Sequence, residues 1–172
     1  MEFEDFRRLL DNLKVDNNEE RAEAEEIYNS LLNSEGMMVV GYLIQASQIN
    51  QTLLHFSLIL LKNIFNKSPD FLADQSNDQS IQSFLLNLID NPSELEAIRL
   101  TAANLIATVA CLFQKNQRWE SFQSDIQQRF GSQNIYSISI ALDCLVLSIH
   151  KELIDTRFVA SLIDELYQMI WP

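Results

Sequence analysis

The sequence predicts an all-α protein, because its composition and its apolar pattern agree. Only 3 glycines and 3 prolines occur in 172 residues, while 47% of the residues are hydrophobic. The short turns of a β-sandwich need more glycine and proline than this. Apolar residues also recur three and four positions apart over long stretches, as they do along one face of a helix. The clearest such stretch is Phe84–Ala110, which predicts two helices around a short turn.

The turn inside this stretch is expected at Asp90–Pro92, because proline removes a backbone donor and restricts the residue before it. Ser93 is predicted to cap the following helix through its hydroxyl group. Glu94 and Glu96 follow in the first turn, where the helix dipole favours negative charge. The apolar stripe of this helix is predicted to comprise Leu95, Ile98, Ala102, Leu105, Ile106 and Val109. A hairpin with such a stripe needs neighbours to pack against.

The same spacing predicts further helices on both sides of this hairpin. In chain order, the expected helices cover 3–13, 19–32, 37–46, Asn50 or Gln51 to 65, the two just described, 119–130, 135–149 and a last one capped by Asp155 or Thr156. Asp16–Asn18 offers capping residues to the second helix, and Asn33–Gly36 is predicted to end it. Lys67–Ser80 is expected to be a polar connection with one helical turn at Phe71-Leu72.

A small residue recurs at the same place in every second helix, and an apolar residue follows three positions later. The small residues are Ala24, Ser57, Ala102 and Ala141, and the apolar ones are Ile27, Leu60, Leu105 and Cys144. The small residues are 33, 45 and 39 positions apart, which is typical of HEAT repeats. Small side chains let two helices approach closely, and the apolar residue fills the groove between them. We therefore expect an α-α superhelix, a HEAT-repeat solenoid; an irregular helical bundle is the alternative.

The expected solenoid has about four and a half helical hairpins and occupies the whole of 1–172 as one array. Its repeats are predicted at about 2–33, 36–66, 79–114 and 118–150, with a half repeat at 155–171. The chain ends inside an apolar pattern at Met169–Pro172. We therefore expect an amino-terminal fragment of a longer array, with the acidic first repeat as its polar end.

The chain is strongly acidic, with a formal net charge of −12 at pH 7. Residues 1–35 hold 11 acidic and 4 basic residues, so a net charge of −7 lies in this segment. Such a charge repels nucleic acid and anionic lipid and favours basic partners. A purely solubilising charge on solvated helix faces is the alternative interpretation.

Targeting and redox signals predict a soluble, intracellular protein. The acidic start of the chain is unlike a signal peptide, and no uninterrupted apolar stretch reaches the length of a membrane span. Cys111 and Cys144 lie within apolar helical patterns, which is typical of small core residues in a reducing compartment.

No pattern of catalytic or metal-binding residues is apparent in the sequence. His55 and His150 lie in different predicted repeats, and neither has a nucleophile motif beside it. There is no glycine-rich phosphate loop, and neither cysteine has a histidine or cysteine near it in sequence as a metal ligand. We therefore expect a protein that is not an enzyme, without catalytic residues, bound metal or cofactor.

Two segments of the first predicted repeat, Leu10–Leu13 and Glu19–Tyr28, carry a family resemblance. With them the repeat resembles the amino-terminal repeat of the importin-beta (karyopherin-beta) family of nuclear transport receptors. The family typically has a short helix, an acidic turn and an Arg-x-x-Ala-Glu pattern, in which Arg21, Ala24 and Glu25 stand here.

Later segments extend this resemblance over the whole chain. Leu60–Ile64 is similar to the Leu-Lys-Asn-hydrophobic stretch of the family's second inner helix, and Arg99 matches the arginine of a HEAT unit. Gln117–Phe122 is similar to the tryptophan-containing start of a fourth repeat in the importin beta-3 subgroup. The sequence departs from the family at Leu54 and Ile138, where arginine is often found.

The resemblance implies a binding protein in nucleocytoplasmic transport, found in the cytoplasm, the nucleus and the nuclear pore. Members of the family bind the GTP-bound small GTPase Ran through the inner helices of their first repeats, and this releases import cargo. The corresponding polar positions here are Glu19, Glu23, Glu26, Lys62, Asn63, Asn66 and Asn104, with Thr101 and Thr108 beside the last. An acidic patch followed by amides suits a partly basic protein surface.

Other implied partners are cargo proteins and, through the full-length chain, nucleoporins, with the receptor itself a monomer. Neither nucleic acid binding nor membrane insertion is expected. Arg21 and Arg99 are expected to brace neighbouring repeats by pairing with acidic groups. A HEAT-repeat scaffold or adaptor, which assembles protein complexes without any dependence on Ran, is the alternative hypothesis.

Overall fold

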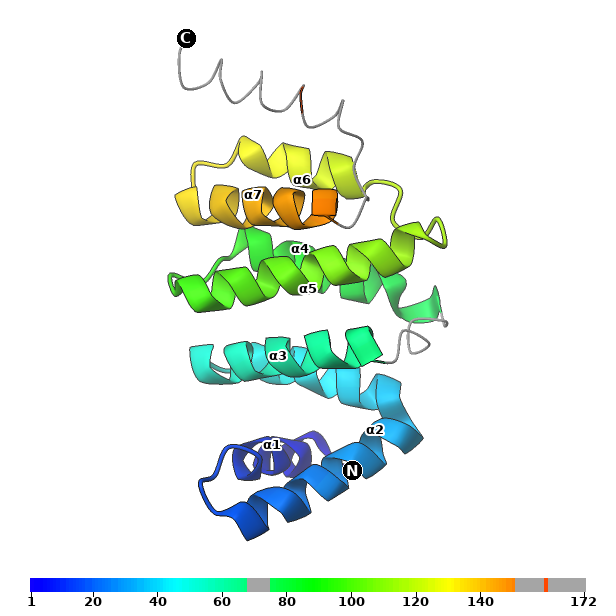
Figure 1. Cartoon of the computed structure of the whole chain (residues 1–172), viewed down its shortest axis with the longest axis vertical. Coiled ribbons are helices and arrows are strands. Elements are labelled where there is room, and N and C mark those ends of the chain that lie inside the picture. Colours follow the sequence, from blue (N-terminus) through cyan, green and yellow to red (C-terminus); the bar gives the residue numbers. More distant parts are fainter. Residues whose placement is uncertain (68–74, 151–159, 161–172) are drawn as a thin grey trace. The chain divides into compact units, whose positions relative to one another are not determined.

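Helices make up the regular structure of the part of the chain that this computed structural model describes, residues 1–67, 75–150 and 160, and no strand occurs there. The elements in order are α1 (Phe3–Asn12), α2 (Asn18–Ser47), α3 (Gln51–Lys67), the 3-10 helix η2 (Gln75–Asn77), α4 (Asp78–Asp90), α5 (Glu96–Gln114), α6 (Phe122–Phe130) and α7 (Ile135–His150) (Figure 1). The predicted all-α class is confirmed. The chain divides into two compact units, Met1–Leu61 and Lys62–Pro172, and the division falls inside α3.

Two expectations fall on residues outside the described part of the chain. These are the helical turn at Phe71-Leu72 and, apart from Ala160, the last helix with the half repeat at 155–171.

In the first unit, α1 and α2 form a hairpin, as the apolar spacing predicted. The buried Phe6 of α1 contacts Tyr42 of α2, with the ring centroids 5.3 Å apart. The side chain of Asn17 accepts a hydrogen bond of 3.0 Å from the backbone N–H of Glu19. The predicted cap before the second helix is therefore confirmed. Asn50 does the same for α3, because its side-chain oxygen accepts the Leu53 N–H at 2.9 Å.

The predicted break at Asn33–Gly36 is confirmed, and it takes the form of a kink at which the two limbs of α2 meet without a loop between them. Only Glu35 leaves helical geometry, with φ −139° and ψ 44°. The Ser34 hydroxyl donates to the carbonyl oxygen of Ser30 at 3.0 Å, so the chain keeps helix-like bonding up to the kink. The two helices expected at 19–32 and 37–46 are therefore two limbs of one bent helix.

The core of the second unit is built around α5, which packs chiefly against α7. Figure 1 shows these two helices side by side and running in the same direction. Ala102 on α5 and Ala141 on α7 are both buried, as expected for the small residues at close helix approaches. The thiol of Cys144 lies 3.8 Å from the carbonyl oxygen of Ala103, and burial raises the pKa of this thiol. Cys144 is a buried core residue, as predicted, whereas Cys111 is half-buried.

Two ion pairs join α4 to the α6 region, one near each end of α4. Asp78, at the start of α4, pairs with Arg118, which lies just before α6. Asp90, at the end of α4, pairs with Arg129 near the end of α6 at 2.8 Å. The two helices therefore run in the same direction, so α4–α5 and α6–α7 are successive hairpins of the same sense.

The helix after Pro92 begins later than predicted, because Ser93 does not cap it. Its hydroxyl oxygen accepts the backbone N–H of Leu95 at 3.1 Å and closes a local turn. α5 then begins at Glu96, and the residue before it makes no side-chain capping bond. Leu95 is 57% exposed, so it does not belong to the predicted apolar stripe, whose other members are buried.

Two further positions differ from the sequence expectation. Ile27 is 41% exposed, so the predicted groove-filling position does not pack in the first repeat. Trp119 precedes α6 and does not lie in it, yet it is buried and its indole N–H donates to the Asp125 carboxylate at 2.9 Å. The loop before it turns sharply at Gln117, whose φ is 56°.

Candidate functional site

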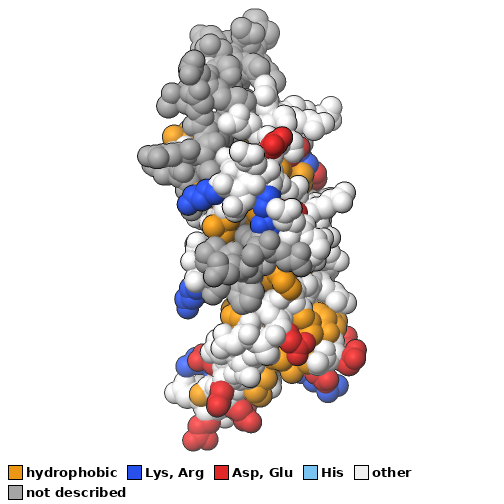
Figure 2. All heavy atoms as spheres, turned by 90° about the vertical axis from the view of Figure 1, so that its right-hand side faces the viewer, with side chains coloured by type: hydrophobic (Ala, Val, Ile, Leu, Met, Phe, Trp, Pro, Cys, Tyr) orange, Lys and Arg blue, Asp and Glu red, His pale blue; other side chains and the backbone are white. Residues whose placement is uncertain are grey.

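The three predicted acidic residues Glu19, Glu23 and Glu26 are exposed on the first two turns of α2, in the first unit. Glu20 and Glu25 on the same turns are exposed as well. Acidic side chains therefore surround this end of α2, and they are not confined to the single face that the spacing suggested. Figure 2 shows acidic side chains gathered over the first unit.

Arg21 was expected to brace a neighbouring repeat, and this expectation is wrong. Its guanidinium group bonds the side chain of Asn18 at 2.9 Å and lies 3.8 Å from Glu25. Both partners belong to α2, because residues three and four positions apart meet on a helix surface. Arg21 therefore offsets part of the negative charge at the start of α2.

Lys62, Asn63 and Asn66 lie on the last turns of α3, within the second unit. Lys62 is half-buried, whereas both asparagines are exposed. The seven predicted partner-binding residues are thus divided between the two units, with the three acidic ones in the first and the other four in the second.

Asn104, the remaining predicted residue, is half-buried on α5. Its side-chain amide donates to the carbonyl oxygen of Leu100, one turn earlier in the same helix, at 3.0 Å. Thr101 makes the same kind of bond to Ala97 at 2.8 Å. Thr108 is only 6% exposed, so it cannot contribute to the open polar face that the spacing suggested. Asn104 and Thr101 therefore each bond a carbonyl oxygen of their own helix.

Arg99 does join two hairpins, but not through the acidic pairing that the sequence predicted. It donates to the carbonyl oxygens of Ser93 and Glu94, at 3.1 and 2.6 Å. Its guanidinium carbon lies 4.6 Å from the centroid of the Tyr136 ring, at the start of α7. Carbonyl oxygens and a π face hold this cation in place.

The Asp143 carboxyl on α7 lies within the electrostatic influence of Arg99. Burial raises the pKa of Asp143, the charge of Arg99 opposes this rise, and Glu96 adds to it. This end of the α5–α7 pair therefore combines a fixed cation with a carboxyl group that is partly desolvated.

The second unit also exposes apolar side chains that sequence reasoning did not single out. They are Leu100 on α5 and Ile135, Leu142 and Val146 on α7. The available signal was that residues 135–149 are apolar nearly all round, which indicates a helix with neighbours on more than one side. We refer to Leu100, Leu142 and Val146 as the apolar α5–α7 residues.

Within the described residues, α5 alone is long and apolar enough to cross a membrane, with a mean hydropathy of 1.4. Just over half of that window, 56%, is buried inside the protein, as in the core helix of a folded domain. The described part of the chain holds no group of three or more histidine, cysteine, aspartate or glutamate side chains that could bind a metal ion. Comparison with known protein families and with curated proteins finds no match to this sequence.

Proposed function

We propose that the chain is a HEAT-repeat array from the amino-terminal region of an importin-beta-like nuclear transport receptor, and that it binds the GTP-bound form of Ran. The observation that carries the proposal is the pair of successive hairpins, α4–α5 and α6–α7. Ion pairs near both ends of α4 join it to the α6 region, and α5 packs against α7, on which Ala102 and Ala141 respectively are buried. Repetition of one hairpin in one sense is the arrangement from which a solenoid grows.

The acidic residues at the start of α2 favour a partner with a basic surface. Glu19, Glu23 and Glu26 are exposed, and none of them takes part in the ion pair between Arg21 and Glu25. Exposed, like-charged side chains accelerate the encounter with a basic surface more than they tighten the final complex. Lys62, Asn63 and Asn66 would then supply hydrogen bonds from α3, and cargo and nucleoporins would bind elsewhere on the full-length receptor.

A protein-assembly scaffold with no Ran dependence is the second candidate. The apolar α5–α7 residues favour it, because exposed Leu100, Leu142 and Val146 offer a partner a contact that needs no nucleotide switch. The two functions differ in one measurable property, the preference for the GTP-bound over the GDP-bound GTPase.

The deciding experiment is a calorimetric titration of this chain with Ran bound to a non-hydrolysable GTP analogue, beside Ran–GDP. A receptor binds the GTP form at least about tenfold more tightly, equivalent to about 1.4 kcal/mol. Equal affinity for the two forms, or binding to neither form, would remove the transport proposal.

A further inference from the structure

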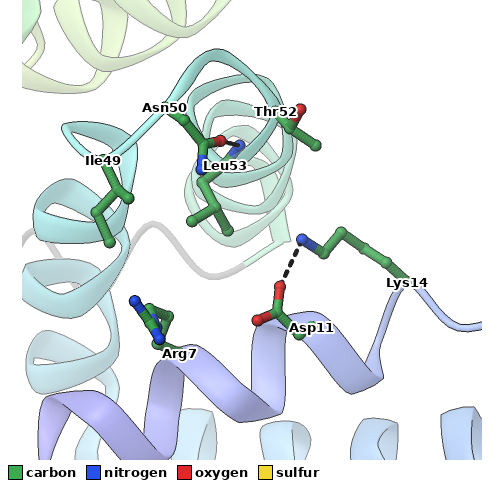
Figure 3. A pocket seen from close by; sticks show the side chains of 7 residues that line it. All are labelled: Arg7, Asp11, Lys14, Ile49, Asn50, Thr52 and Leu53. Atoms are coloured by element: carbon green, nitrogen blue, oxygen red, sulfur yellow. Dashed lines mark hydrogen bonds and ion pairs between the residues drawn. The ribbon is translucent and has the colours of Figure 1, made fainter.

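A hollow of about 350 Å³ opens in the first unit, where α1 faces the turn between α2 and α3 (Figure 3). It is lined by Arg7, Asp11, Lys14, Ile49, Asn50, Thr52 and Leu53. Its volume is at the lower end of the range for small-molecule sites, so it suits a compact ligand. All of the lining residues belong to one unit.

The hollow concentrates positive charge in a unit that has very little of it. Residues 1–61 contain 4 basic residues, Arg7, Arg8, Lys14 and Arg21, against 11 acidic ones. Arg7 and Lys14 both line the hollow, and Asp11 is the one carboxylate among the lining residues. Figure 3 shows both cations extending from the α1 side toward the opening. The hollow is therefore locally cationic on a strongly acidic unit.

The ion pairs of these two cations are weak, and the Lys14 ammonium group also lies 5.9 Å from the centroid of the Phe56 ring. Lys14 pairs with Asp11 at 2.8 Å, and Arg7 lies 3.5 Å from Glu4. Both are pairs three positions apart in sequence, and each has a carboxylate partner more than half exposed, a kind of pair worth less than about 1 kcal/mol. The Arg7 side chain is 42% exposed, so a ligand can compete with Glu4 for its guanidinium group.

The opposite wall adds neutral polar groups and the start of a helix. Asn50 and Thr52 come from the first residues of α3, and the Asn50 side chain is held in place by the Leu53 N–H. The amino-terminal end of a helix of this length carries partial positive charge, which acts in the same direction as the two cations.

We propose that this hollow binds a compact oxyanion, a carboxylate or phosphate group, between Arg7 on α1, Lys14 just after α1 and the first turn of α3. The ligand oxygens would accept hydrogen bonds from the Arg7 guanidinium group and from the Lys14 ammonium group, which would release its weak pairing with Asp11. The site is separate from the proposed Ran-binding residues and does not depend on that function.

The test is an NMR titration of the ¹⁵N-labelled full chain with sodium phosphate and, separately, with sodium succinate, at an ionic strength kept constant with chloride. We expect the amide signals of Lys14, Thr52 and Leu53 to shift together and to saturate with at least one of the two probes. Saturation by phosphate alone or by succinate alone identifies which oxyanion the site takes. Shifts that do not saturate with either probe would overturn the proposal.

Three single substitutions distinguish a specific binding site from general electrostatic attraction. Arg7→Gln removes a direct ligand and is expected to weaken binding by about tenfold or more. Asp11→Asn removes the repelling carboxylate and is expected to tighten binding, an effect that loss of folding cannot produce. Arg8→Gln is the matched control, because it removes one positive charge from the same helix at a position outside the hollow. The affinity of this variant should stay within about twofold of the unaltered protein. Equal effects of Arg7→Gln and Arg8→Gln would show that only net charge matters, and the site would be rejected.

Discussion

At the residue scale, Arg118 contacts side chains of two helices in the second unit. Its guanidinium group bonds both carboxylate oxygens of Asp78, and its carbonyl oxygen accepts the side-chain amide of Gln82 at 2.8 Å. The guanidinium carbon also lies 4.7 Å from the centroid of the Phe113 ring. Arg118 is only 7% exposed and Asp78 only 16%, so water cannot replace either partner readily. The arginine therefore ties the start of α4 to the loop that follows α5.

Removing this arginine is expected to destabilise the protein substantially. Arg118→Gln leaves the Asp78 carboxylate largely buried without its counter-charge, which costs about 3 kcal/mol in the free energy of unfolding. Chemical denaturation followed by circular dichroism measures this loss. Arg8→Gln is the control, because the Arg8–Asp5 pair is exposed and should contribute less than about 1 kcal/mol. Equal losses in the two variants would mean that the Asp78–Arg118 pair contributes no more to the free energy of unfolding than the exposed Arg8–Asp5 pair.

At the element scale, α5 is the helix around which the second unit packs. Its alanines let α7 approach closely, and Ala102, Ala103, Ala107 and Ala110 are all at most 2% exposed. Larger residues such as Leu105 and Ile106 fill the remaining space. The contact between α5 and α7 therefore depends on side-chain volume as much as on hydrophobicity.

Enlarging one of these alanines is expected to force the two helices apart. Ala102→Leu adds volume to a packed contact and should lower the free energy of unfolding by about 1–3 kcal/mol. Thermal unfolding measures the change. Ala97→Leu is the matched control, because Ala97 is exposed on the same helix and the same substitution there should change stability by less than about 0.5 kcal/mol. If the two variants unfold at the same temperature, the assignment of Ala102 to a close helix approach is incorrect.

At the scale of the whole molecule, charge is distributed unevenly along the chain. Residues 1–35 carry −7 of the total of −12, and residues 36–61 contain no aspartate, glutamate, lysine or arginine. The first unit therefore attracts basic partners over distances of about 10 Å at 0.1 M salt, and this attraction weakens as salt is added.

If Ran is the partner, the charge on α2 should control how fast it associates. Reversing Glu23 and Glu26 to lysine is expected to slow association by roughly threefold to tenfold at low salt and to reduce its salt dependence. Stopped-flow fluorescence at low and high salt measures both quantities. The control reverses Glu94 and Glu120, which are exposed in the second unit and change the net charge by the same amount. Identical kinetics in the two double variants would remove the acidic end of α2 from the binding model.

The candidate site could be predicted from the sequence only in part. Helical spacing correctly predicted that Glu19, Glu23 and Glu26 are exposed, because side chains on the outside of a helix need no partner. The same spacing failed for Thr108, because burial depends on which helix lies opposite, and a single helix does not contain that information. The oxyanion hollow was not foreseen for the same reason, since Arg7 and Thr52 are brought together only by the packing of α1 with the turn before α3.

The sequence by itself determined the helical class, most helix positions and the burial of the small residues Ala24, Ser57, Ala102 and Ala141, because these follow from local spacing and local backbone chemistry. Tertiary structure decided the features that depend on neighbours distant in sequence. Ser93 closes a turn and leaves α5 uncapped. The Asp78–Arg118 pair joins residues 40 positions apart. Such contacts arise only when whole helices pack, because each depends on the side chains that another element brings to the same place.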